Sequence, residues 1–193
     1  PVPVLVVPDA RVALADAAAA GFRHPSRAMP VVGVTGTNGK TTITHLLRDC
    51  LAADRRKAGL IGTIAYEFAG RRIPAPNTTP DALRIHGYLR DMADRRADGC
   101  VLEGSSHGLA QQRVRGVRFA AAVFSNLTQD HLDYHGTMRD YAAAKARLFE
   151  MLEPGATACV CIDSPWAEPM LDACDVGVNV LTFGCNPDAE VRA

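Results

Sequence analysis

The chain has 193 residues with 21 basic and 21 acidic side chains, so its formal net charge is zero. This balance argues against a protein that wraps nucleic acid, which would carry a clear basic excess. Hydrophobic residues make up 48% of the chain and charged residues 22%, which excludes a disordered protein and provides for a core of ordinary size. No run approaches the ~18 apolar residues of a membrane span. We expect a cytoplasmic protein, and we expect it to be a monomer.

The first residues, Pro1 to Val7, include no initiator methionine and no basic segment typical of a signal peptide, so the sequence looks like part of a longer chain. The cysteines show no spacing typical of a zinc site or a disulfide framework. We expect them to be buried free thiols in a reducing compartment. They are Cys50, Cys100, Cys159, Cys161, Cys174 and Cys185.

In the first half of the chain, apolar β-branched runs alternate with helical patterns. A short strand is expected over residues 4–7, followed by a helix over 12–21 that Asp9 could cap. Residues 25–30 form a break and a candidate linker. A buried strand over 30–34 leads through a glycine-rich turn into a helix over 40–55. A strand over 60–66 and a loop over 71–77 precede a helix capped by Thr79, with Pro80 in its first turn, that reaches residue 96.

The alternation continues in the second half. We expect a strand over 100–103, a helix over 106–113 and a strand over 120–125. Thr137 caps a helix that reaches residue 152, followed by a strand over 158–162, a helix over 166–174 and a strand over 178–183. Residues 188–193 resemble the start of another strand. Such alternation predicts the α/β class, with a mainly parallel sheet flanked by helices on both faces.

A glycine-rich turn, Gly33-Val-Thr-Gly-Thr-Asn-Gly-Lys-Thr-Thr42, lies between a predicted buried strand and a predicted helix. Backbone N–H groups of such a turn can hold phosphate oxygens, while Lys40 neutralises the terminal phosphates and Thr41 offers a hydroxyl to Mg²⁺. The strict phosphate-loop pattern fails, because Val34 stands where the first glycine belongs. The alternative, a glycine-rich turn with a solvated lysine, explains fewer of these features.

Polar side chains follow the ends of two further predicted strands. Glu103 ends a buried strand at the edge where open α/β sheets bind ligands, and it could hold the Mg²⁺ of a nucleotide. Residues 126–136 follow the next strand, and His131 in this loop could be a metal ligand. The alternatives are an exposed glutamate at a strand end and a capping or core histidine.

Two other motifs are candidates for substrate binding, namely Asn77-Thr-Thr-Pro80 and Ser105-Ser-His107 with Gln111 and Arg113. Arg113 could hold a substrate carboxylate through paired hydrogen bonds. The alternatives are a loop with a helix cap and a surface arginine.

Lysine is rare in this chain, because 18 of the 21 basic residues are arginine and the others are Lys40, Lys57 and Lys145. A retained lysine hints at a site where arginine will not serve. Lys145 lies within an alanine-rich helix, which suits a crowded pocket wall, although a lysine on a helix surface is the alternative.

Four motifs, at residues 35–42, 77–80, 103–109 and 126–136, occur in this order and are followed by Tyr141, Lys145 and Phe149. Together they resemble the Mur ligase family, in particular the members that add the third residue to the peptidoglycan peptide. The resemblance implies a phosphate-loop NTPase-like central domain over 30–193, incomplete at its end. It also implies that 1–29 are the end of an amino-terminal substrate domain with its linker, and that the carboxy-terminal domain is absent.

The resemblance also implies roles for individual residues. ATP phosphates would be bound by Gly36, Thr37, Asn38, Gly39, Lys40, Thr41 and Thr42. One Mg²⁺ would be held by Thr41 and Glu103, and a second by Glu103, His131 and Lys145, the lysine being carbamylated by CO₂. The catalytic residues would be Lys40, Glu103, His131 and Lys145. The UDP-muramoyl dipeptide would contact Asn77, Thr78, Thr79, Ser105, Gln111 and Arg113.

The implied activity is ATP-dependent ligation of an amino acid, diaminopimelate or lysine, to UDP-N-acetylmuramoyl-L-alanyl-D-glutamate through an acyl phosphate. One rival is a related ligase, such as a folate polyglutamylating enzyme, against which the motifs at 77–80 and 105–107 weigh. The other is a phosphate-loop NTPase that is not a ligase, which gives no reason for Lys145 or the loop around His131. The 193 residues by themselves could be a nucleotide-binding module without turnover.

Overall fold

The computed structural model describes residues 2 and 4–192. Its helices are α1 (Ala10–Gly21), α2 (Lys40–Ala53), α3 (Ala82–Asp94), α4 (Ser106–Ala110), α5 (Leu132–His135), α6 (Met138–Glu150) and α7 (Glu168–Asp172), with a 3-10 helix η1 (Pro25–Arg27). Its strands are β1 (Val31–Thr35), β2 (Ala58–Ile61), β3 (Ala65–Phe68), β4 (Arg71–Pro74), β5 (Gly99–Glu103), β6 (Phe119–Phe124), β7 (Leu152–Cys161), β8 (Asn179–Gly184) and β9 (Val191–Arg192).

Within the described residues, the nine strands form one sheet in the order β4-β3-β2-β5-β1-β6-β7-β8-β9. All neighbouring strands from β2 to β9 in this order are parallel, and only β3 and β4 run antiparallel to their neighbours. The predicted α/β class with a mainly parallel sheet is therefore confirmed.

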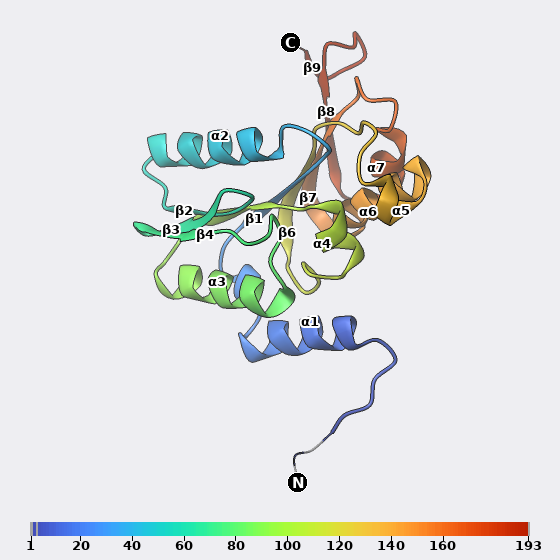
Figure 1. Cartoon of the computed structure of the whole chain (residues 1–193). Helices are drawn as coiled ribbons and strands as arrows, with labels where there is room; N and C mark the ends of the chain where they lie inside the picture. The colour runs from blue at the N-terminus through green and yellow to red at the C-terminus, as the bar shows by residue number, and fades with distance from the viewer. Residues whose placement is uncertain (1, 3, 193) are drawn as a thin grey trace.

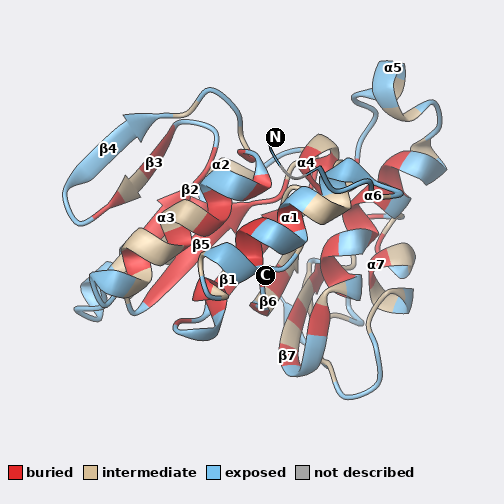
Figure 2. Cartoon of the chain, turned by 90° about the horizontal axis from the view of Figure 1, so that it is seen from below, coloured by how far each residue is buried: buried red, intermediate tan, exposed pale blue. Residues whose placement is uncertain are grey.

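Helices cover both faces of this sheet (Figure 1). Helix α2 lies on one face and contacts β1, β2 and β5, whereas α3 lies on the other face with α1 packed beyond it. Helix α6 contacts β1 and β7. The central strand β5 is buried along its whole length, while the edge strand β4 is exposed (Figure 2). The core is thus centred on β1 and β5, whose ends carry the predicted motifs.

Two helix caps follow the sequence prediction. The Asp9 carboxylate accepts hydrogen bonds from the first turn of α1, and the Thr137 hydroxyl accepts one from the backbone of Asp140 at the start of α6. The predicted cap of α3 is wrong, because that helix begins after Asp81, whose side chain accepts from Arg84 N. Thr79 is buried, and its hydroxyl donates to the backbone carbonyl of Glu103.

The prediction of a strand over residues 4–7 is also wrong, because this apolar segment pairs with no strand. Its side chains at positions 4 to 6 are each more than 80% exposed. A β-branched run favours a strand only where a neighbouring strand or surface covers it. The cysteines are all free, as expected, but only Cys100 is buried, and Cys50 and Cys185 are exposed.

The segment after α2 reverses direction twice, and the sequence did not predict this. Residues 60–66 are divided between β2 and β3 by a turn at 62–64, and residues 71–74 form β4 rather than a loop. Ala69 and Gly70, both with positive φ, make the hairpin turn between β3 and β4. Such a two-residue turn matches the natural twist of the two strands. The first turn brings residues 62–64 to the edge of the sheet that carries the motifs.

Candidate functional site

The predicted motifs meet at one edge of the sheet. Strands β1, β5, β2 and β6 are parallel, so their carboxyl ends lie together. The segments that follow these ends are the glycine-rich turn, residues 104–105, the turn at 62–64 and the loop that begins at Ser125. In open α/β sheets, ligands bind outside the carboxyl ends of the strands. This edge is therefore the candidate site.

The glycine-rich turn is clamped against the loop after β6. The N–H of Thr37 donates to the carbonyl of Asn126 at 2.9 Å, and the N–H of Asn38 donates to the Asn126 side chain at 3.0 Å. Gly36 has a φ of +147°, and a Cβ there would collide with Ser125. Gly39 precedes α2 with a φ of +86°, and no side chain caps the helix. The N-terminus of this 14-residue helix is thus open to an anion, which fits phosphate.

Lys40 extends back over the turn. Its Nζ donates to the carbonyl oxygens of Gly36 and Thr37, each at 2.9 Å. Burial lowers the pKa of this amine, while the charges of Glu103 and Asp130 oppose that shift. The side chain therefore lies along the turn, where a cation would neutralise bound phosphate.

Glu103 has no exposed surface, and both oxygens of its carboxylate accept hydrogen bonds. Its Oε2 accepts from the hydroxyl of Thr41 at 3.0 Å and from that of Thr63 at 2.8 Å. Its Oε1 accepts from the N–H of Thr63 at 3.0 Å. Carboxylate and hydroxyl oxygens are ligands that Mg²⁺ accepts, so the pair of Thr41 and Glu103 fits that ion.

Lys145 is buried, at 1% exposure, so the interpretation as a surface lysine is wrong. Its Nζ donates to the carbonyl of Gly36 at 2.8 Å and lies 4.5 Å from the centre of the Tyr141 ring. Burial first, and the charge of Lys40 second, lower its pKa to about 7. A large fraction of this amine is consequently neutral at physiological pH.

His131 stands at the start of α5 with a φ of 51°, and its side chain is about half exposed. Its Nε2 lies 3.4 Å from a carboxylate oxygen of Asp130, and its ring meets Tyr141 edge-on at 6.2 Å. His131 and Lys145 therefore both lie beside Tyr141. Among the described residues, no three side chains of His, Cys, Asp and Glu form a metal-holding group. The two Mg²⁺ sites predicted from the sequence would therefore need further ligands, namely the Thr41 hydroxyl and a carbamate on Lys145.

The predicted substrate residues form a second group beside Glu103. Arg113 donates to the carbonyl of Thr79 at 2.7 Å and to the side-chain oxygen of Gln111 at 2.7 Å. The Thr79 hydroxyl contacts Glu103 O at 2.7 Å and Ser105 Oγ at 3.0 Å. Thr79 has no exposed surface, so its side chain serves to hold the loop.

Some members of this group also line a cavity. A cavity of about 340 Å³ is lined by Arg11, Leu14, Asn77, Asp81, Ala82, Gln111, Gln112 and Arg113. Three of the predicted substrate residues, Asn77, Gln111 and Arg113, thus share one surface. The arginine fork suits a ligand that carries carboxylates.

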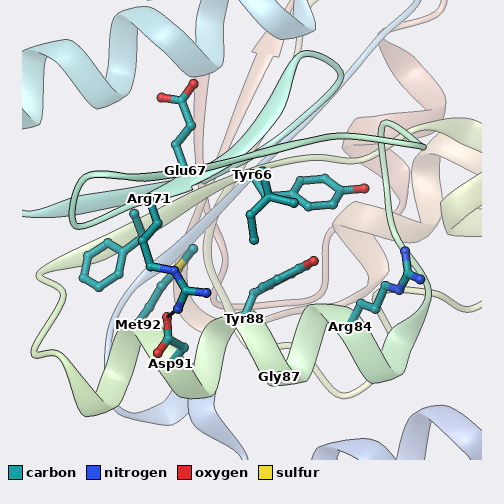
Figure 3. A pocket seen from close by; sticks show the side chains of 10 residues that line it. Tyr66, Glu67, Arg71, Arg84, Gly87, Tyr88, Asp91 and Met92 are labelled. Carbon is teal, nitrogen blue, oxygen red and sulfur yellow. Dashed lines mark ion pairs between the residues drawn. The ribbon is translucent and has the colours of Figure 1, made fainter.

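Tyr66 holds the loop at residues 77–80 through a hydrogen bond to its backbone. The hydroxyl of Tyr66 donates to the carbonyl of Asn77 at 2.7 Å, and its ring lies 5.1 Å from that of Tyr88. The two rings face a cavity of about 380 Å³ between the hairpin and α3, where Arg71 pairs with Asp91 (Figure 3). Tyr66 therefore connects this cavity to the loop at residues 77–80, which carries predicted substrate residues and is named the substrate loop below.

Two residues at the site, Thr63 and Tyr141, have no role predicted from the sequence. Thr63 contacts both Glu103 and Thr78, and could have been found had the turn signal at Gly62 been used to divide the strand. Tyr141 was noted without a role, yet its hydroxyl lies 3.2 Å from Thr37 Oγ1 and its ring stacks on His135. That stacking depends on tertiary packing and has no local signal.

Two known proteins are similar to this chain over nearly its whole length. The chain is 45% identical over 195 residues to UDP-N-acetylmuramoyl-L-alanyl-D-glutamate–2,6-diaminopimelate ligase from Geobacter metallireducens, covering 98% of this chain and 38% of that protein. It is 43% identical over 207 residues to UDP-N-acetylmuramyl-tripeptide synthetase from Roseiflexus sp. strain RS-1, covering 100% of this chain and 41% of that protein. The chain thus spans about two fifths of the length of these relatives.

Solved structures show the same fold. A structure of a UDP-N-acetylmuramoyl-L-alanyl-D-glutamate–2,6-diaminopimelate ligase matches with a TM-score of 0.82 and 34% identity over 95% of this chain and 38% of that chain. Folylpolyglutamate synthase from Mycobacterium tuberculosis, solved with ADP and AMPPCP, matches with a TM-score of 0.73 over 89% of this chain and 47% of that chain, at 19% identity. The second likeness concerns the fold alone.

No helix among residues 2 and 4–192 is long and apolar enough to cross a membrane. The family model of the Mur ligase middle domain matches residues 34–193, which include the glycine-rich turn, Glu103, the loop around His131 and Lys145. The chain belongs to the Mur ligase family, and residues 34–193 correspond to its middle domain.

Proposed function

We propose that the full-length protein is an ATP-dependent ligase that adds diaminopimelate to UDP-N-acetylmuramoyl-L-alanyl-D-glutamate. The observation that carries this proposal is the single sheet edge at which Glu103 separates two groups of residues. On one side lie Lys40 and Thr41 of the glycine-rich turn, and on the other lies the loop held by Arg113. The relatives at 41–48% identity, with the names of such ligases, support this choice of substrate.

The glycine-rich side would bind ATP. Backbone N–H groups of residues 36–42 would hold the phosphates, and Lys40 would neutralise their charge. Mg²⁺ held by Thr41 and Glu103 would supply further neutralisation, and the second ion would use Glu103, His131 and the Lys145 carbamate. These residues position the terminal phosphate rather than react with it, because phosphoryl transfer depends mostly on positioning and charge neutralisation.

The other side would bind the acyl substrate. The surface that carries Asn77, Gln111 and Arg113 would contact part of the UDP-muramoyl dipeptide. Ser105 and Thr78 would also contact this substrate, so that its free carboxylate faces the terminal phosphate. Attack by that carboxylate on the γ-phosphorus breaks the bond to ADP and gives an acyl phosphate. The amine of the amino acid then displaces inorganic phosphate and forms the amide. We assign residues 30–193 to the ATP-binding domain and 1–29 to the end of a preceding substrate domain with its linker.

The test is turnover by the full-length protein. With ATP, Mg²⁺, UDP-N-acetylmuramoyl-L-alanyl-D-glutamate and diaminopimelate, we expect ADP, phosphate and the tripeptide product, the last identified by mass spectrometry. The same assay with lysine in place of diaminopimelate tests whether lysine is the amino acid that the protein adds. A folate with glutamate tests the related ligase activity, and turnover with that pair instead of the muramoyl dipeptide contradicts the proposal.

A further inference from the structure

Thr63 stands between the two sides of the site. It lies exposed in the turn that joins β2 to β3. Its N–H and its hydroxyl hold both oxygens of the Glu103 carboxylate, at 3.0 and 2.8 Å. The same hydroxyl oxygen lies 3.0 Å from the hydroxyl of Thr78 in the substrate loop. Thr63 is thus a direct contact between the proposed metal carboxylate and the proposed substrate loop.

The chemistry of these groups gives the contacts a direction. An ionised carboxylate only accepts hydrogen bonds, and a threonine hydroxyl has one hydrogen to donate. Because the hydrogen of Thr63 points to Glu103, the hydrogen between the two threonines must come from Thr78. The charge of Glu103 therefore orients Thr63, and Thr63 in turn orients Thr78.

The backbone around Thr63 is fixed independently of this hydroxyl. Leu60 and Ile61 pair with Glu67 and Tyr66 in the antiparallel ladder on either side of the turn. A Cβ at Gly62 would collide with the Glu103 carboxylate, so the turn is packed directly against that group. Removal of the Thr63 hydroxyl alone should consequently leave the turn and the N–H bond to Glu103 in place, and break the hydroxyl's contacts with Glu103 Oε2 and Thr78.

Resting on the function proposed above, we propose that Thr63 is a positioning residue that couples occupation of the ATP side to binding of the acyl substrate. If a ligand on the ATP side binds the Glu103 carboxylate, the oxygen that accepts from the Thr63 hydroxyl is no longer available in the same way. The Thr63 hydroxyl then reorients, and the orientation of the Thr78 hydroxyl changes with it. The reaction needs the substrate carboxylate and the terminal phosphate held in line at close range, and small errors of placement slow such steps greatly. A hydroxyl shared by both sides provides that alignment.

The experiment uses the full-length protein with the isosteric variant Thr63→Val, the conservative variant Thr63→Ser and the control Thr157→Val. Thr157 lies in β7, remote in the sheet from the turn at 62–64. Binding of the UDP-dipeptide is measured by calorimetry with and without a non-hydrolysable ATP analogue and Mg²⁺. We expect the analogue to lower the Kd for the dipeptide in the wild type. In Thr63→Val, the factor by which the analogue lowers this Kd should be at least about fivefold smaller. Thr63→Ser and the control should retain it.

Kinetics give a second readout. Thr63→Val should raise the KM for the dipeptide about fivefold or more while the KM for ATP changes by less than about twofold. Thr78→Val in the Thr63→Val background should add no further loss, because the two side chains act through one contact. If Thr63→Val does not fold, the comparison of Thr78→Val with Thr78→Ser replaces it and should show the same loss of coupling.

The outcomes separate this inference from the proposed function. A wild type that turns over normally, together with a Thr63→Val variant that keeps its coupling, overturns the inference alone. Equal losses in Thr63→Ser and Thr63→Val also overturn it, because the hydroxyl would then not be the group that matters. A wild type with no ligase turnover overturns the proposed function and the inference with it.

Discussion

The side-chain amines of Lys40 and Lys145 donate to the same acceptor, the carbonyl oxygen of Gly36, at 2.9 and 2.8 Å. Burial favours loss of a proton from the more buried of the two amines, and repulsion by the other ammonium group on the same oxygen adds to this effect. The more buried amine is that of Lys145, whose pKa falls to about 7. A large fraction of this amine is therefore neutral and nucleophilic at physiological pH, beside the turn that would hold phosphate.

We predict that Lys145 of the full-length protein takes up CO₂ as a carbamate. A neutral amine is the reactive form, and the resulting anion would be attracted to Mg²⁺ where an ammonium would be repelled. ¹³C-labelled CO₂ should give a carbamate signal in the NMR spectrum of the wild type, and this signal should be missing from Lys145→Arg. Turnover should fall heavily in Lys145→Ala and should not recover in Lys145→Arg, since a guanidinium stays protonated.

Lys57→Arg is the matched control, because Lys57 is an exposed lysine in the segment between α2 and β2. It should keep both the signal and the activity. Short carboxylic acids added to Lys145→Ala should restore part of the turnover by filling the vacant anion position. Full activity of Lys145→Arg would refute the carbamate.

The low pKa of Lys145 also predicts a dependence of stability on pH. Between pH 7 and 10.5 the unfolded chain holds a proton on this amine that the folded chain has lost, so stability rises with pH across this range. In CO₂-free buffer, the free energy of unfolding of the wild type relative to Lys145→Met should increase by about 2 kcal/mol from pH 7 to pH 9. Urea unfolding followed by circular dichroism measures this difference. A difference independent of pH would show that the amine stays protonated in the folded protein.

We predict that Lys40 is needed for nucleotide binding. Its Nζ lies over the turn within reach of bound phosphate, and loss of a charge-assisted hydrogen bond costs roughly 1.5–3 kcal/mol. Lys40→Ala should therefore weaken ATP binding by about tenfold to a hundredfold in calorimetry. Lys57→Ala should bind as the wild type does. Unchanged ATP affinity in Lys40→Ala would show that this turn does not bind the phosphates of ATP.

We predict that Arg113 serves the acyl substrate. Its guanidinium lines the cavity with Asn77 and Gln111, on the other side of Glu103 from the turn. Arg113→Ala should raise the KM for the UDP-dipeptide by about tenfold or more and change the KM for ATP by less than about twofold. Arg118→Ala, which removes a surface ion pair with Glu153, is the control. A larger effect on ATP would mean that the two subsites are reversed.

The parts of the site that the sequence predicted are those with local signals. A buried strand followed by glycines, lysine and a helix start indicates an anion site without knowledge of the rest of the fold. Glu103 was found because it ends an apolar run, and Lys145 because the chain otherwise uses arginine. The parallel sheet followed from the regular alternation of strands and helices.

The predictions from the sequence fail at positions where contacts between residues far apart in the chain determine the local structure. Thr79 and Asp81 both stand where a helix cap could be, and the choice is made by the bond of the Thr79 hydroxyl to the carbonyl of Glu103, far away in sequence. Residues 4–7 have the composition of a strand but no partner strand. The reversal at 62–64 was missed because the apolar run on both sides of Gly62 looked continuous, and the contacts of Thr63 were missed with it.

The two turns that flank β3 should differ in how they tolerate change in length. One added residue at 62–64 would shift β3 by one position, turn the buried Tyr66 and Phe68 outward and move Thr63 away from Glu103. The tip at Ala69 and Gly70 is exposed, and a Cβ at Gly70 would meet only open space. Members of the family that differ in length in this region should therefore differ at the hairpin tip. A fluorescent label attached at this tip should report on the loop at residues 77–80, because Tyr66 connects that loop to the hairpin. The label should leave the loop itself undisturbed.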